Sequence, residues 1–122
     1  FELEIRCADL NDARLEPEAF NLVHAALVFE YITWRPFIPH VAGTLTRGGM
    51  LSVVLQLPAT AIPPVTPTPF TSLQSLESLF HFVDPDALIE AAGEAGLVID
   101  RRRLEPLPSG KAFEVLRFRK SC

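Results

Sequence analysis

Residues 20–32 read FNLVHAALVFEYI, and residues 45–55 read LTRGGMLSVVL. The run from Leu22 to Phe29 is nearly continuous in apolar side chains, which suits a central parallel strand covered on both faces but also the start of a buried helix. We place a strand at 20–25 and a helical turn after it. Residues 50–57 have the composition of a second buried strand, which Pro58 ends.

A helix is predicted between these two strands. Pro36 and Pro39 are tolerable only near a helix start, where a missing N–H leaves no intrahelical bond unmade. Apolar residues then recur at helical spacing from Phe37 to Leu45. The pair Gly48-Gly49 supplies the left-handed residue that commonly ends a helix, so we expect the helix to end there.

The carboxyl-terminal third predicts one helix and two strands. Asp84 is the expected N-cap, with Pro85 in the first helical position and Gly96 closing the helix. The expected inner face is apolar and consists of Leu88, Ile89, Ala92 and Ala95. Strands follow at 97–104 and 112–119, joined by a turn that contains Pro108, Ser109 and Gly110.

Two other segments carry weaker patterns. Residues 3–8 alternate apolar and charged side chains, which favours a strand near a sheet edge. Five of the eleven prolines fall between Pro58 and Pro69, so this stretch is expected to be a stiff, exposed loop. The loop region 63–75 is a candidate lid or recognition segment, or else a plain connector. Thr71 and Gln74 have the spacing of a capping box for a short helix.

The totals bound the class of protein. A chain of 122 residues allows one domain and is short for a complete doubly wound enzyme. It begins at Phe1 without an initiator Met, so we interpret it as a fragment. A net charge of -4 gives no general attraction for nucleic acid or an anionic membrane. No apolar run approaches the roughly 20 residues of a membrane-spanning helix.

Cysteines and histidines predict neither disulfides nor a metal centre. Cys7 and Cys122 are too few and too unpatterned for a disulfide framework or a zinc site, which fits the reducing cytoplasm. His24, His40 and His81 are dispersed and are not joined to other ligands at metal-binding spacing. We therefore expect no metal and a cytoplasmic location.

The order of predicted elements resembles the carboxyl-terminal part of a class I S-adenosylmethionine-dependent methyltransferase of the type 11-like kind. The most specific pieces are the strand and loop that end in Glu30-Tyr31 and the Gly48-Gly49 turn before a buried strand. The resemblance covers nearly the whole chain. It implies an incomplete α/β Rossmann-like fold with the third to seventh strands, the last of them antiparallel, in a single partial domain at 1–122.

By this resemblance, five residues would contact S-adenosylmethionine in the parent protein. Asp9 would accept a hydrogen bond from the adenine amino group, with Leu10 against the ring. Ala25, Ala26 and Leu27 would allow the methionine part to approach closely. The alternatives are that Asp9 merely starts a loop and that the other three are simply core residues.

Three further residues are candidates for chemistry near the transferred methyl group. Glu30 stands where relatives often have His, and it could hold or deprotonate an acceptor if it faces the pocket and burial raises its pKa. Its alternative is a carboxylate at a helix start. Tyr31 and Gln56 are the other candidates, with packing and a solvated strand end as their alternatives.

Two features of the family have no counterpart here. The chain lacks both the glycine-rich loop after the first strand and the acidic residue after the second, so the isolated fragment is expected to be inactive. The absent first strand would also leave the strand at 20–25 with an open apolar edge. We expect that edge to mediate homo-oligomers such as a dimer, unless residues 3–8 move into the vacancy.

The resemblance implies a parent enzyme that transfers a methyl group to a small-molecule acceptor, without nucleic acid or membrane partners. One alternative is a noncatalytic α/β module whose proline loop or exposed edge binds a protein. Another is a fragment of a different doubly wound enzyme, such as an NAD-dependent oxidoreductase.

Overall fold

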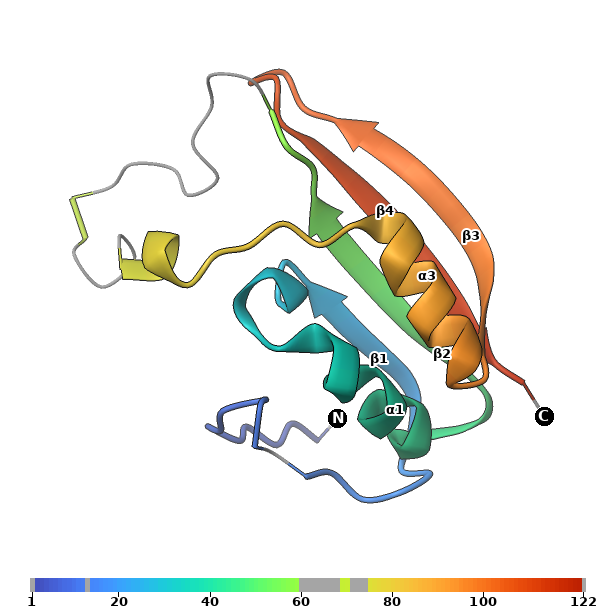
Figure 1. Cartoon of the computed structure of the whole chain (residues 1–122). Helices are drawn as coiled ribbons and strands as arrows, with labels where there is room; N and C mark the ends of the chain where they lie inside the picture. The colour runs from blue at the N-terminus through green and yellow to red at the C-terminus, as the bar shows by residue number, and fades with distance from the viewer. Residues whose placement is uncertain (1, 13, 60–68, 71–74, 122) are drawn as a thin grey trace.

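The structure is a computed structural model that describes residues 2–12, 14–59, 69–70 and 75–121. Its elements are β1 (Phe20–Ala26), the 3-10 turn η1 (Phe29–Tyr31), α1 (Trp34–Thr44), β2 (Leu45–Gln56), the 3-10 turn η2 (Ser75–Ser78), α3 (Pro85–Glu94), β3 (Leu97–Pro106) and β4 (Ala112–Lys120). The strands form one sheet in the order β1-β2-β4-β3. Helices α1 and α3 lie on the same face of this sheet (Figure 1).

The strand directions confirm the predicted fold class. β1 is parallel to β2, and β4 lies antiparallel between β2 and β3. The parallel pair is connected through α1, and the β3–β4 pair is a hairpin (Figure 1). The molecule is therefore a mixed α/β sheet whose last strand is antiparallel.

The hydrophobic core lies between the sheet and the two helices. Alternate residues of β2 and β4 are fully buried there, because a strand points successive side chains to opposite faces. This inner layer consists of Leu51, Val53, Leu55, Leu116 and Phe118. Ile38 from α1 and Leu88 from α3 pack against it. The intervening residues Met50, Ser52 and Val54 are only half-buried, so the helices cover one face of the sheet.

Strand β1 differs from its prediction as a strand covered on both faces. The prediction of a strand at 20–25 is confirmed, but Ala25 is its only buried residue. Leu22 is 58% exposed. Within the described residues β1 pairs with β2 alone, which leaves its outer edge open.

The end of α1 also differs from its prediction. The helix ends at Thr44 and β2 begins at once, so Gly48-Gly49 lies inside the strand. The pairing register with β1 is interrupted here, because Phe20 pairs with Leu45 whereas Leu22 pairs with Met50. Gly48 adopts its left-handed φ of +75° within β2, where this register shift occurs, and not at the end of α1. The prediction that Gly48 ends the helix is therefore wrong.

Residues 3–8 form no strand, contrary to the prediction. Leu3 and Ile5 are 72% and 83% exposed, and Arg6 pairs with Glu4 and Glu16. A strand needs a hydrogen-bonded neighbour, and this segment pairs with no strand in the described part of the chain. It therefore does not fill the vacancy beside β1.

Pro39 was expected near a helix start but lies inside α1. The predicted inner face of α3 is confirmed at Leu88 and Ala92, whereas Ile89 and Ala95 are only partly buried and Ala91 is buried as well.

The predicted start and end of α3 and the hairpin turn are confirmed. Asp84 Oδ1 accepts a hydrogen bond from the Asp86 N–H at 3.0 Å, Pro85 begins α3, and Gly96 follows the helix with φ +85°. The hairpin turn contains Gly110 with φ +95°. The capping box at Thr71 and most of the proline loop lie outside the described residues.

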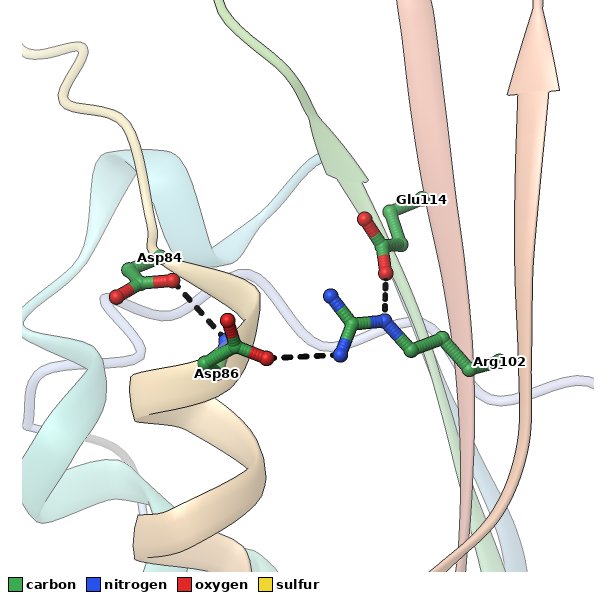
Figure 2. A network of polar contacts seen from close by, with 4 residues as sticks. All are labelled: Asp84, Asp86, Arg102 and Glu114. Carbon is green, nitrogen blue, oxygen red and sulfur yellow. Dashed lines mark hydrogen bonds and ion pairs between the residues drawn. The ribbon is translucent and has the colours of Figure 1, made fainter.

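Arg102 ties the start of α3 to the sheet. Its Nη1 donates to Asp86 Oδ1 at 2.8 Å, and its Nε donates to Glu114 of β4 (Figure 2). Arg101 and Arg103 point to the opposite face, where they line a small pocket of about 160 Å³ with Arg117. The strand therefore divides its three consecutive arginines between the two faces.

No helix in the described part of the chain is long and apolar enough to cross a membrane.

Candidate functional site

The carboxyl ends of β1 and β2 lie at one edge of the sheet, which is where open α/β folds bind ligands. Beyond β1, Leu27 adopts a left-handed backbone with φ +57° and donates its N–H to Val54 O at 3.0 Å. This conformation costs a non-glycine residue roughly 1–2 kcal/mol. Ala26 and Leu27 are exposed at this edge, whereas Ala25 is buried in the core.

Glu30 connects three segments below this edge. Its side chain is fully buried, and Oε2 accepts a hydrogen bond of 2.7 Å from the Gln56 N–H at the end of β2. Its backbone oxygen accepts from the His81 N–H at 2.9 Å. Burial raises the pKa of the Glu30 carboxyl, although the hydrogen bond from Gln56 opposes this shift.

Glu30 was proposed as a catalytic candidate on two conditions, that it faces the pocket and that burial raises its pKa. Only the second condition is met. Its pKa is raised, but its side chain has no exposed surface and is not among the lining residues of the pocket of about 510 Å³ that Tyr31 borders. Oε1 is buried without a hydrogen-bond partner among the described residues. Gln56 is also buried. Glu30 therefore links η1, β2 and the segment before α3 through these hydrogen bonds, and a catalytic role for it stays a prediction.

Tyr31 borders a pocket of about 510 Å³. The lining residues come from the N-terminal segment, the start of α1 and the segment before α3, and they are Asn11, Tyr31, Ile32, Thr33, Trp34, Arg35, Leu79 and His81. The Tyr31 ring meets Phe80 edge to face, with centroids 5.6 Å apart. Burial and the neighbouring Glu30 raise the pKa of the Tyr31 phenol. The phenol is therefore neutral near pH 7.

Sequence reasoning missed most of this pocket. Trp34 and Arg35 follow the Glu30-Tyr31 pair and begin α1, and the Arg35 guanidinium lies 4.7 Å from the centroid of the Trp34 ring. The signal available in the sequence was the chain's single tryptophan beside an arginine, directly after the predicted strand and turn.

Asp9 and Leu10 lie in a turn that also contains Asn11, one of the residues that line this pocket. Asp9 Oδ1 accepts from the Asn11 N–H at 2.9 Å, and Asn11 Oδ1 accepts from the Thr33 N–H at 2.9 Å. Leu10 packs partly against the core. This arrangement matches the interpretation of Asp9 as a loop start, and its contact with adenine stays a prediction.

Within the described residues no group of three His, Cys, Asp or Glu side chains could hold a metal ion.

Comparison with solved structures shows that the chain has the carboxyl-terminal part of the class I methyltransferase fold. An S-adenosylmethionine-dependent methyltransferase from Mesorhizobium loti matches with a TM-score of 0.69 and 16% identity over 92% of this chain and 67% of that one. N-methyltransferase NodS from Bradyrhizobium japonicum WM9, complexed with S-adenosyl-L-homocysteine, matches with a TM-score of 0.62 and 19% identity over 93% and 52%. The [4+2]-cyclase SpnF matches with a TM-score of 0.68 and 13% identity over 95% and 56%.

The chain thus spans about half to two thirds of the length of these proteins. At such low identities the likeness shows the fold alone, and a cyclase among the matches illustrates that one fold carries more than one activity. No protein-family model matches the chain, and no curated protein matches it in sequence.

Proposed function

We propose that this chain is the carboxyl-terminal part, as a single domain at 1–122, of an enzyme that transfers a methyl group from S-adenosylmethionine to a small-molecule acceptor. The observation that carries the proposal is the structural likeness of more than nine tenths of the chain to methyltransferases, one of them solved with S-adenosyl-L-homocysteine. The open carboxyl edge of β1 and β2 supports it, because this edge suits a ligand.

The residues at this edge fit the proposed cofactor. Ala26 is exposed, and its small side chain allows a ligand to approach the backbone at the Leu27 bend. Asp9 is an exposed hydrogen-bond acceptor of the kind that an adenine amino group needs, and Leu10 offers an apolar side chain next to it. We assign the methionine part of the cofactor to Ala25, Ala26 and Leu27 and the adenine to Asp9 and Leu10. When bound, the cofactor would supply an electrophilic methyl group on its sulfonium.

The acceptor is assigned to the pocket beside Tyr31. This pocket is lined by Asn11, which follows Asp9 and Leu10 in the sequence, and its volume of about 510 Å³ lies within the usual range of ligand sites. Glu30 and Gln56 would act as positioning residues, since both are buried and a hydrogen bond joins them. The isolated chain is expected to be inactive, because it contains no glycine-rich loop that would hold the cofactor in line with the acceptor.

We further propose that the isolated chain forms a dimer through the outer edge of β1. This edge carries the exposed Phe20 and Leu22, and it has no partner strand within the described residues. Two copies related by a twofold axis would pair their β1 strands and continue the sheet across the interface.

The absence of a disulfide pattern around Cys7 and Cys122 supports our expectation of a cytoplasmic location.

The proposed function is tested by titrating the complete protein that contains this chain with S-adenosyl-L-homocysteine and, separately, with NAD. We expect binding of the former alone, and methyl transfer from labelled S-adenosylmethionine to a small acceptor. Binding of NAD alone would identify an oxidoreductase instead. Binding of neither would favour the noncatalytic module.

A further inference from the structure

The pocket beside Tyr31 combines aromatic surface with positive charge. Tyr31 and Trp34 provide ring surface, and Arg35 and His81 provide basic groups. Among the residues that the structure describes, no carboxylate lines this pocket. The side chain of the neighbouring Glu30 is fully buried and is not among these lining residues. A ligand that is planar and anionic complements both properties of this pocket.

Arg35 is available to such a ligand. Its guanidinium is held over the Trp34 ring, at 4.7 Å from the centroid, and it is exposed. Within the described residues it forms no ion pair. Glu94 shares a neighbouring pocket of about 350 Å³ with it but does not pair with it. A guanidinium presents several N–H donors in a plane, which matches the two oxygens of a carboxylate.

The three segments around the pocket are joined by hydrogen bonds. Asn11 accepts from the Thr33 N–H, and the His81 N–H donates to the backbone oxygen of Glu30. Thr33 precedes α1 without a side-chain hydrogen bond that caps it. A carboxylate beside Arg35 would therefore also lie near the positive end of the helix dipole. These links keep the aromatic and basic groups in a fixed relation.

We propose that this pocket binds a small aromatic carboxylate, with its ring between Tyr31 and Trp34 and its carboxylate at Arg35. The inference names a substrate class for the acceptor site, and in this respect it rests on the proposed methyltransferase function. Binding itself does not require the cofactor. A one-ring carboxylate occupies only part of the volume of about 510 Å³, so larger aromatic acids would also fit.

The chain contains one tryptophan, Trp34, so its fluorescence reports directly on this pocket. We would titrate the full chain with benzoate, with the neutral isostere benzamide and with acetate, and confirm the affinities by calorimetry. Benzoate is expected to change the fluorescence to saturation, with benzamide and acetate binding at least about threefold more weakly. Arg35→Gln should weaken benzoate binding about three- to tenfold.

Arg47→Gln is the matched control, because Arg47 is exposed near the amino end of β2 and does not line the pocket. It removes the same charge and should leave benzoate binding unchanged. Equal effects of the two substitutions, benzamide binding as tight as benzoate binding, or no saturable benzoate binding would each overturn the proposal. Benzoate binding does not depend on the titration with S-adenosyl-L-homocysteine, so failure of one proposal is distinguished from failure of the other.

Discussion

Glu30 and Gln56 are linked by a buried hydrogen bond of 2.7 Å from the Gln56 backbone N–H to Glu30 Oε2. Glu30→Gln keeps an oxygen that can accept this bond, so this variant should be at least as stable as the unsubstituted chain at neutral pH. Glu30→Leu removes the carboxylate oxygen that accepts the Gln56 N–H in this buried place, which should cost about 1–3 kcal/mol. Urea unfolding of both variants measures the difference, and equal stability would show that the bond contributes nothing.

The pH dependence of Glu30 follows from the direction of its pKa shift. Burial raises the pKa of this carboxyl in the folded state above its ordinary value of 4.5. The folded protein thus keeps a proton that the unfolded chain has lost, and the stabilisation is full below pH 4.5 and lost as the pH rises through the folded pKa. The unfolding free energies of the unsubstituted chain and of Glu30→Gln should diverge as the pH rises, with the unsubstituted chain becoming the less stable.

Glu4→Gln is the control for this pH dependence. The hydrogen bond from Arg6 lowers the pKa of the exposed Glu4 carboxyl. Its stabilisation is present above the ordinary pKa and is lost as the pH falls, which is the opposite sign. A parallel pH trend in the two variants would contradict the assignment of the effect to the burial of Glu30.

Arg102 is predicted to matter more through Glu114 than through Asp86. Glu114 is buried, and Arg102→Met would leave its carboxylate without this partner, at a cost of about 1–3 kcal/mol (Figure 2). Asp86 is exposed, so Asp86→Asn should cost less than about 1 kcal/mol. Thermal unfolding ranks the two variants, and a larger loss for Asp86→Asn would contradict this account.

Two glycines provide a matched pair for testing the strand irregularity. A Cβ at Gly49 would lie 2.7 Å from Thr46 O, so Gly49→Ala should destabilise the chain by roughly 0.5–3 kcal/mol. A Cβ at Gly43 in α1 meets nothing within 4 Å, so Gly43→Ala should stabilise it by roughly 0.5–1 kcal/mol. Denaturant unfolding measures both signs, and a neutral Gly49→Ala would show that the backbone relaxes there.

Self-association is predicted to depend on β1 rather than on the opposite edge of the sheet. Leu22 of β1 and Leu104 of β3 are 58% and 57% exposed, which makes them a matched pair. Leu22→Lys should convert the dimer to a monomer, because charged side chains oppose edge pairing, whereas Leu104→Lys should not. Light scattering over a range of concentrations distinguishes them, and a monomeric parent chain would refute the proposed dimer.

The elements that were predicted correctly depend on local chemistry. The Asp84 cap, the Pro85 start of α3 and the glycine turn at Gly110 each require particular residues at particular positions, which a sequence displays directly. The buried strand at 50–57 was recognisable because its apolar residues are contiguous.

The failures arose where the outcome depends on distant partners. Residues 3–8 have an alternating pattern, but no strand of the described ranges pairs with them. Gly48 has the conformation expected of a helix end but uses it within β2. For Glu30, the sequence indicated a position near the site, but its burial and its hydrogen bonds to Gln56 and His81 depend on segments distant in the sequence. Trp34 and Arg35 were missed because their shared pocket requires residues from three separate segments.

The left-handed backbone of Leu27 has a consequence for how the edge of the sheet could receive a ligand. Its hydrogen bond to Val54 fixes the direction in which the chain leaves β1. The edge is thus preorganised, and a molecule that arrives there meets a backbone already in place. Ligand binding at this edge therefore costs less conformational entropy than binding at a loop that becomes ordered only around its ligand.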